Sequence, residues 1–303
     1  MTMSKCNSHK YANGDFYFGQ ELKGEPDGFG IYCWANGDVY EGEWKEGKRK
    51  GDGVLEFANG DNYKGAWVCD LRDGPGCHIW PNGDVYKGEW KNDEREGSGV
   101  LEFANGDTYK GAWLCDRRDG PGCHVWANGD VYKGGWKRDK REGDGVLEYA
   151  NGDTYKGAWL CDRRDGPGCH VWANGDVYEG EWKRDEREGD GVLEFANGDS
   201  YKGAWLCDRR DGPGCQVWAN GDVYEGEWKR DKREGDGVFK YANGDTYKGA
   251  WLCDRRDGPG CQFWANGDVY KGEWQNGKRQ GYGVMEYADG DTYGGQWHMD
   301  RRV

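Results

Sequence analysis

Cysteine and histidine are the residues of this chain best suited to bind a metal or to form a covalent bond. Five cysteine pairs share the spacing C-x7-C: Cys69/Cys77, Cys115/Cys123, Cys161/Cys169, Cys207/Cys215 and Cys253/Cys261. Side-chain alternation predicts that both members of a pair lie on one face, where a cross-strand disulfide is geometrically conceivable. His78, His124 and His170 each follow the second cysteine of a pair, so a metal site is the alternative.

Irregularities in the series favour a third interpretation, in which the cysteines are small apolar residues. Cys33 has Glu25 at the position of its partner. Gln216 and Gln262 replace the histidine in the last two pairs. A metal site that required histidine would therefore be absent from part of the molecule, and the spacing differs from that of common zinc sites. We predict no metal, no cofactor and no catalytic residue.

Signatures of enzymes are absent from the sequence. It contains no P-loop, no H-E-x-x-H and no G-x-S-x-G motif. Paired carboxylates are numerous, but they recur at regular intervals, whereas catalysis needs one singular pocket. The chain is therefore predicted not to be an enzyme.

The surroundings of these residues are strictly periodic. Asn-Gly-Asp recurs every 23 residues, starting at Asn13, Asn36, Asn59, Asn82, Asn105, Asn128, Asn151, Asn174, Asn197, Asn220, Asn243 and Asn266, and a thirteenth copy reads Asp289-Gly290-Asp291. Such self-similarity is typical of repeat architectures. We predict a short non-repeat segment at residues 1–10, followed by one continuous array over residues 11–303.

Each repeat is expected to form a β-hairpin with strands at residues 100–104 and 107–114 in one example. Asn-Gly between alternating residues favours a two-residue type I′ turn. Counting back from that turn pairs Glu102 with Tyr109 and places Tyr109, Gly111 and Trp113 on one face. Phe103 is expected on the other face. Stacked hairpins would then align tyrosine, glycine and tryptophan in rows, so that rings pack on rings and on bare backbone.

This pattern resembles a known family. Tyr109-x-Gly111-x-Trp113-x6-Gly120-x-Gly122 resembles the MORN repeat, and the resemblance covers nearly the whole chain. It implies an all-β fold, an elongated single-sheet array of stacked antiparallel hairpins with about 12 full units and a partial last one. The family often has glycine three residues after the tryptophan. Here aspartate usually replaces it, and Gly47 and Gly277 are exceptions.

Together these features favour a non-enzymatic scaffold or adaptor in the cytoplasm, at a cytoskeletal or membrane-associated structure. The net charge of −14 argues against nucleic acid as a partner. No apolar stretch is long enough to span a membrane, and no signal peptide is visible. The aromatic face is the candidate surface for protein partners, with Tyr86, Trp90, Tyr109, Trp113, Tyr132, Trp136, Tyr155, Trp159, Tyr178, Trp182, Tyr201 and Trp205.

Three alternatives stay open at the level of sequence. A basic ridge could bind phosphoinositides or other anionic lipids through Arg117, Arg118, Lys137, Arg138, Arg163 and Arg164, although neighbouring acidic residues cancel most of its charge. The resemblance also allows an accessory subunit of an enzyme, such as a phosphatidylinositol phosphate kinase. The last unit, with Tyr293 and Trp297, is a candidate for self-association into a homodimer, because an uncovered edge strand can pair with a second copy.

Overall fold

The computed structural model describes residues 6–303, which contain strands and turns and no helix. The described residues form two compact units, with the boundary between residues 150 and 151. Sequence repeats continue across this boundary, and the expectation of one continuous array stays a prediction. Residues 1–5 of the predicted N-terminal segment lie outside the described part, and residues 6–10 form a strand.

Thirteen strands make up the first unit. They are β1 (Cys6–Lys10), β2 (Phe16–Leu22), β3 (Glu25–Cys33), β4 (Val39–Lys45), β5 (Lys48–Glu56), β6 (Asn62–Val68), β7 (Leu71–Ile79), β8 (Val85–Lys91), β9 (Glu94–Glu102), β10 (Thr108–Leu114), β11 (Arg117–Val125), β12 (Val131–Lys137) and β13 (Lys140–Glu148). Each strand pairs antiparallel with the next along the chain.

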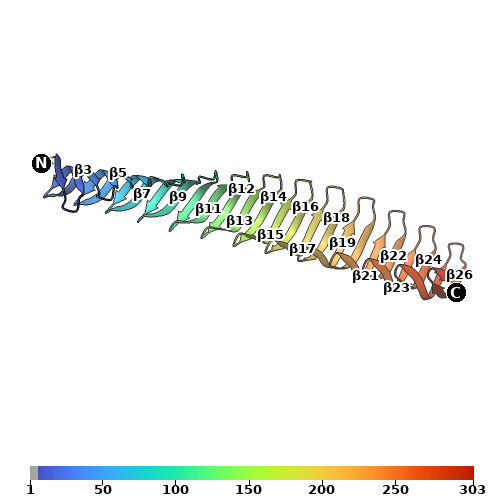
Figure 1. The fold of residues 1–303 in the computed structure, drawn as a ribbon. Coiled ribbons are helices and arrows are strands. Elements are labelled where there is room, and N and C mark those ends of the chain that lie inside the picture. The colour runs from blue at the N-terminus through green and yellow to red at the C-terminus, as the bar shows by residue number, and fades with distance from the viewer. Residues whose placement is uncertain (1–5) are drawn as a thin grey trace. The chain divides into compact units, whose positions relative to one another are not determined.

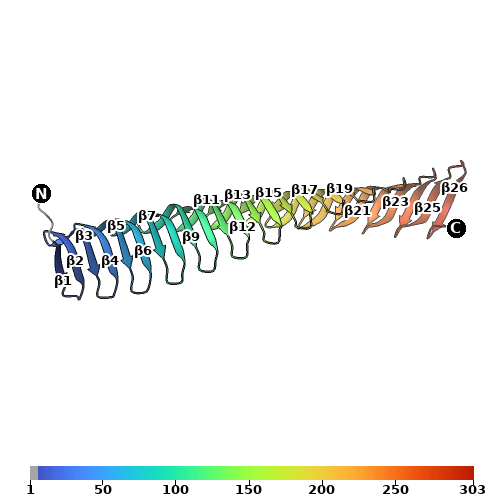
Figure 2. The same cartoon turned by 90° about the horizontal axis from the view of Figure 1, so that it is seen from above.

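Fourteen strands make up the second unit. They are β14 (Thr154–Leu160), β15 (Arg163–Val171), β16 (Val177–Lys183), β17 (Glu186–Glu194), β18 (Ser200–Leu206), β19 (Arg209–Val217), β20 (Val223–Lys229), β21 (Lys232–Lys240), β22 (Thr246–Leu252), β23 (Arg255–Phe263), β24 (Val269–Gln275), β25 (Lys278–Glu286), β26 (Thr292–His298) and β27 (Arg301–Arg302). Within each unit the strands lie side by side in chain order, as Figures 1 and 2 show. The predicted meander of antiparallel hairpins is confirmed.

The Asn-Gly turn differs from the predicted type I′ turn. Phe103 donates its N–H to the Asp107 carbonyl at 2.9 Å, and Gly106 donates to the Phe103 carbonyl at 2.9 Å. Gly106 has a φ of +94°, whereas Asn105 does not have a positive φ. The connection is therefore a three-residue loop, in which one turn is followed by a left-handed glycine.

This longer loop shifts the strand register by one residue. Tyr109 lies opposite Leu101, and Glu102 lies opposite Thr108. The predicted pairing of Glu102 with Tyr109 was wrong, and so was the placement of Phe103 on the face away from Tyr109. A shift of one residue exchanges the two faces of a strand. Phe103 thus lies on the same face as Tyr109, where its ring centre is 6.1 Å from that of His124.

Turns with two left-handed residues are present at the other end of the hairpins. Cys115 has a φ of +48° and Asp116 a φ of +64°, between the paired residues Leu114 and Arg117. Aspartate thus adopts the conformation that glycine has at Gly277, where φ is +84°. The turn accommodates aspartate because Asp and Asn tolerate this region better than most residues.

Tyrosine and tryptophan form the core of each unit. Twelve tyrosines, from Tyr17 to Tyr270, have no exposed surface. The ring of Trp113 lies edge-to-face between Tyr109 of its own hairpin, at 5.2 Å, and Tyr86 of the preceding hairpin, at 5.4 Å. The arrangement recurs, for example with Tyr201 at 5.6 Å from Trp228. Each hairpin therefore buries its rings against the next one.

Glycine is required beneath each tyrosine ring. Gly111 and Gly122 lie opposite each other on β10 and β11, and the ring of Tyr109 covers both. A Cβ atom on either glycine would overlap the Tyr109 hydroxyl group. That hydroxyl donates a hydrogen bond to the Ala112 carbonyl at 3.0 Å, so the ring is fixed at both ends.

We expect Gly122→Ala to destabilise the fold by about 1–3 kcal/mol, because its methyl group would displace the Tyr109 ring. Pro121→Ala is the control, since Pro121 is the exposed neighbour of Gly122; it should change the unfolding free energy by less than about 1 kcal/mol. Urea unfolding followed by tryptophan fluorescence measures both. Equal effects of the two substitutions would contradict this role of glycine.

Candidate interaction surfaces

The twelve rings predicted to contact a partner lie beneath the surface. All six of their tyrosines are fully buried, and their tryptophans are only 3–5% exposed. Neighbouring hairpins cover them, as described for Tyr109 and Trp113. A role of these rings in partner binding stays a prediction, and any contact with a partner would have to pass through the side chains above them.

Those covering side chains include a second row of rings. The aromatic residue two positions before each Asn-Gly, such as Phe195 or Trp218, is half-buried on the same face as the tyrosines. Phe195 and Trp218 border a cup of about 340 Å³ whose floor includes Tyr201 and Trp205. These outer rings are the part of the aromatic face that a partner can touch.

Arginine links each hairpin to the next on this face. The guanidinium group of Arg118 lies 4.2 Å from the ring centre of Trp136, and its Nε–H donates to Asp139 Oδ1 at 3.2 Å. The Arg118 backbone N–H donates to the same oxygen at 3.0 Å. Equivalent arginine–aspartate pairs are Arg49/Asp70, Arg72/Asp93, Arg95/Asp116, Arg164/Asp185, Arg187/Asp208, Arg210/Asp231, Arg233/Asp254 and Arg279/Asp300.

These pairs divide the predicted basic ridge into two groups. Arg118 and Arg164 are half-buried and engaged with Asp139 and Asp185. Arg117, Lys137, Arg138 and Arg163 are exposed. Only the exposed group has side chains available to a lipid head group.

The aspartate of each Asn-Gly-Asp links hairpins at the opposite edge. Asp107 Oδ1 accepts the N–H of Ala127, in the next turn, at 2.8 Å, and this bond contributes most to holding the pKa of Asp107 below its usual value. Asn105 accepts the Asp107 N–H at 2.9 Å. At Pro81 no N–H is available, and Asp61 instead contacts His78 Nε2 at 3.3 Å. Within residues 6–303 no group of three acidic, histidine or cysteine side chains is arranged to hold a metal.

His124 is buried opposite Tyr109 rather than paired with a cysteine. Its Nδ1 lies 3.1 Å from Arg118 Nη1, and its Nε2 lies 3.7 Å from Asp107 Oδ2. Burial, followed by the charge of Arg118, lowers its pKa below 6.5. Burial likewise lowers the pKa values of His78 and His170. A neutral imidazole therefore accepts a hydrogen bond from arginine here, and Gln216 Oε1 does the same for Arg210 at 2.9 Å.

Members of the cysteine pairs do not share a face. Cys115 is exposed in a turn, whereas Cys123 lies opposite Lys110, on the face away from Tyr109. Most of strand β11 separates them, which is far beyond the reach of a disulfide. The expectation that both members lie on one face was wrong. It assumed alternation through a turn whose conformation was unknown.

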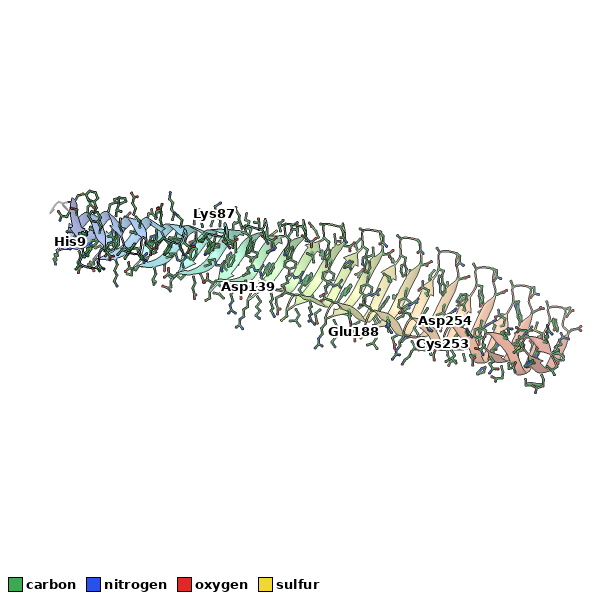
Figure 3. All side chains as sticks on the ribbon, in the orientation of Figure 1. His9, Lys87, Asp139, Glu188, Cys253 and Asp254 are labelled. Carbon is green, nitrogen blue, oxygen red and sulfur yellow. The ribbon has the colours of Figure 1, made fainter. Side chains whose placement is uncertain are left out.

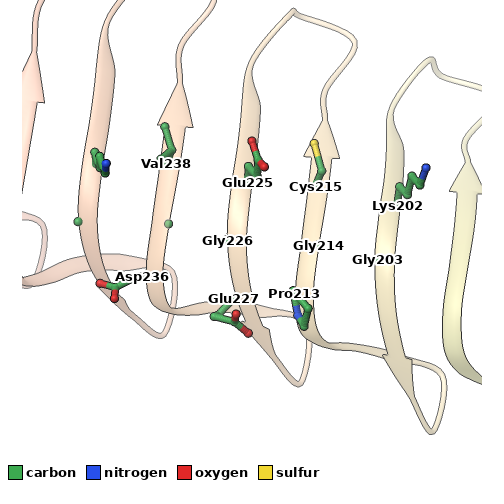
Figure 4. Close-up of a pocket in the computed structure, with 13 residues that line it drawn as sticks. Lys202, Gly203, Pro213, Gly214, Cys215, Glu225, Gly226, Glu227, Asp236 and Val238 are labelled. Carbon is green, nitrogen blue, oxygen red and sulfur yellow. The ribbon is translucent and has the colours of Figure 1, made fainter.

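A groove crosses the strands on the face away from the tyrosines. Figure 4 shows its floor, which includes Gly203, Gly214 and Gly226, between two rows of side chains. One row comprises Lys202, Cys215, Glu225 and Val238, and the other comprises Pro213, Glu227 and Asp236. The volume is about 900 Å³. The glycines contribute only backbone to this floor, because a side chain at their positions would point to the tyrosine face.

Twelve consecutive matches to the model of the MORN repeat cover residues 17–292, at 17–39, 40–62, 63–85, 86–108, 109–131, 132–154, 155–177, 178–200, 201–223, 224–246, 247–269 and 270–292. The chain belongs to the MORN-repeat family. Each MORN match begins at the tyrosine that covers the paired glycines, so the family pattern coincides with the core. MORN repeats generally form non-enzymatic scaffolds for protein or membrane interactions. No curated protein matches the chain.

Solved structures with some likeness are distant. The TCP10 domain of Danio rerio CPAP in complex with a STIL peptide is 13% identical, with 80% of this chain and 93% of that chain covered and a TM-score of 0.28. The SAS-4 TCP domain of Drosophila melanogaster with a proline-rich motif of Ana2 is 14% identical, with 66% and 90% covered and a TM-score of 0.26. Virginiamycin B lyase of Staphylococcus aureus is 9% identical, with 97% and 94% covered and a TM-score of 0.15. We base no functional argument on these scores.

The arginine–tryptophan–aspartate contact was not predicted from the sequence. A signal for it exists, because Arg118 and Asp139 are 21 residues apart and this spacing recurs through the array. Figure 3 labels Asp139 and Asp254, two of the aspartates involved. The aspartate stands at the position where the sequence departs from the family pattern, and its carboxylate accepts the hydrogen bonds of the arginine.

Acid should destabilise the fold through the buried histidines. Their pKa values are lower in the folded state, so the unfolded state binds more protons as the pH falls below about 6.5 and stability decreases. Replacing His78, His124 and His170 together by glutamine should flatten the dependence between pH 7 and pH 5, since Gln216 and Gln262 occupy equivalent positions.

Urea unfolding at each pH measures this effect. The carboxylates provide an internal reference, because the pKa of Asp107 is lowered from 3.8 and its contribution is lost only in more acidic solution. If the unfolding free energy of the triple variant falls as steeply between pH 7 and pH 5 as that of the wild type, the histidines are not responsible.

Proposed function

We propose that this protein is a non-enzymatic scaffold that holds protein partners on the aromatic face of its hairpins. The supporting observation is the row of half-buried outer rings, one in each hairpin, above a core that is fully packed. Aromatic rings that are partly exposed and rigidly held are favoured anchors in protein interfaces. A repeated ring also allows one partner to contact several hairpins, or several partners to bind in sequence.

The cup between Phe195 and Trp218 illustrates how such an anchor would work. Aromatic rings and Leu193 line part of it, and the polar side chains around them include Arg187, Arg210 and Asp208. Both arginines are engaged, Arg187 with Asp208 and Arg210 with Asp231. An apolar side chain of a partner would enter the cup with little competition from unpaired charge, and the polar rim would exclude water around it.

Lipid recognition is the weaker alternative. Arg118 and Arg164 are unavailable, and the exposed Arg117 and Arg138 lie in a chain with a net charge of −14. An anionic membrane attracts a surface that is net basic. The structure therefore supports protein partners over lipids as the ligand of this array, and an accessory role beside an enzyme would be one form of such partnership.

Location and self-association complete the proposal. Nothing among residues 6–303 forms a helix able to cross a bilayer. We propose action in the cytoplasm, at a cytoskeletal or membrane-associated structure. A homodimer through the C-terminal repeats also stays a proposal. Of its two candidate residues, Trp297 is buried beside Tyr293 and pairs with Arg302 of β27, so a second copy would meet the backbone of β26 ahead of Trp297 rather than that indole ring.

The test begins with proximity labelling of the intact protein to name a partner, followed by titration of that purified partner. Replacing Phe195 and Trp218 by alanine should weaken binding about tenfold or more, because anchor rings typically contribute over 1 kcal/mol each. Leu206→Ala with Val217→Ala is the matched control, since both residues are exposed on the opposite face.

Thermal melts establish that both double variants are folded. Equal affinity of the ring variant and the wild type would contradict the proposal, and so would equal weakening by the control pair. If the chain binds vesicles that contain phosphatidylinositol bisphosphate but binds no protein partner, the lipid alternative replaces this proposal.

A further inference from the structure

One position interrupts the series of arginine–aspartate pairs in the second unit. Gly277 occupies the turn position that is aspartate in the neighbouring hairpins, yet Arg256 is retained opposite it. The earlier exception, Gly47, differs in this respect. It faces Pro26, which has neither a guanidinium group nor an N–H. Among the described arginines of this series, Arg256 is the one that faces glycine.

The equivalent site at Arg210 shows which hydrogen bonds an aspartate side chain accepts at this turn. Asp231 Oδ1 accepts the Arg210 backbone N–H at 3.0 Å and its Nε–H at 3.2 Å. The Asp231 carbonyl accepts from Nη2 at 3.1 Å, and Gln216 accepts from Nη1 at 2.9 Å. Two donors of a single arginine therefore converge on one carboxylate oxygen.

Arg256 is held in the same pose without that carboxylate. Its Nη1 donates to Gln262 at 2.8 Å, its Nη2 donates to the Gly277 carbonyl at 2.8 Å, and its guanidinium carbon lies 4.0 Å from the ring centre of Trp274. Among residues 6–303, no side-chain acceptor is recorded for its backbone N–H or its Nε–H, in contrast to Arg210. Burial lowers the pKa of this guanidinium group, and the charge of Asp300, which pairs with Arg279, opposes part of the effect.

The space beside these donors is open. A Cβ atom built on Gly277 would meet no other atom within 4 Å. Arg256 itself is half-buried rather than enclosed, so a ligand can reach it from solvent. The geometry thus combines a fixed cation, two convergent donors and an unfilled space of the size of one carboxyl group.

We propose that the Arg256 N–H and Nε–H, beside Gly277, form a binding site for a carboxylate group from outside the chain. The aspartate side chains at the equivalent turns define both its size and its orientation. Charge-assisted hydrogen bonds to a planar guanidinium group are the strong ones, and stacking on Trp274 fixes the plane of that group.

The carboxylate would come from an acidic side chain or the C-terminus of a protein partner. This assignment rests on the proposed function, whereas the existence of the site does not. A scaffold of nearly identical hairpins needs an irregular position to fix the register of a bound partner, and Gly277 provides one.

The experiment observes arginine Nε–H resonances of the full-length protein by NMR during titration with sodium acetate, with sodium chloride at equal ionic strength as the reference. Acetate should shift the Arg256 Nε–H and backbone N–H resonances in a saturable manner, and chloride should not. Gly277→Asp should abolish the acetate shift because its own carboxylate fills the site. Asp231→Gly should create a second responsive site at Arg210.

Absence of a saturable shift in the wild type, or an equal response to chloride, would overturn the proposal. A response that persists in Gly277→Asp would also overturn it. Two short peptides then separate the sources of the carboxylate: an amidated peptide with one internal aspartate, and a peptide with a free C-terminus and no acidic residue. Binding of acetate but of neither peptide would retain the site and reject its assignment to a protein partner.

Discussion

Edge-to-face packing between tyrosine and tryptophan of successive hairpins is the interaction on which the structure depends. The buried tryptophans lie between two tyrosines, as Trp136 does between Tyr132 at 5.3 Å and Tyr109 at 5.5 Å. Because the tyrosine ring lies flat on the backbone, two facing glycines are needed below it.

Side chains at both ends of the strands make each hairpin depend on its neighbour. Asp107 bonds the next turn at one end, and the pair Arg118 and Asp139 does so at the other. Most of the aspartates, arginines and histidines therefore stabilise the packing of the hairpins. In the sequence, these residue types are the ones that suggest ligand binding or catalysis. Groups that remain available to a ligand are found where the repeat pattern is broken, as at Gly277, or where the pattern faces solvent, as at Phe195.

Composition and period were enough to predict the strands, the aromatic rows and the family. The prediction failed at the turns, because turn type depends on backbone angles that Asn-Gly alone does not determine. A loop longer by one residue moved Phe103 to the tyrosine face, and a two-residue turn at Cys115 and Asp116 separated the paired cysteines. Burial was the other limit. The sequence predicted that rings of stacked hairpins pack on one another, but not that Tyr109 and Trp113 would be left with almost no exposed surface for a partner.

The most direct measurement is a double-mutant cycle between Tyr109 and Trp136, each replaced by leucine, with unfolding free energies from urea titration. Tyr109 with Trp67, whose ring packs on Tyr40 and Tyr63 instead, serves as the reference pair. Our account predicts a coupling of about 0.5–1.5 kcal/mol between Tyr109 and Trp136, and additivity within about 0.5 kcal/mol for the reference pair. Additive effects in both cycles would contradict the claim that each hairpin is stabilised by the rings of the next.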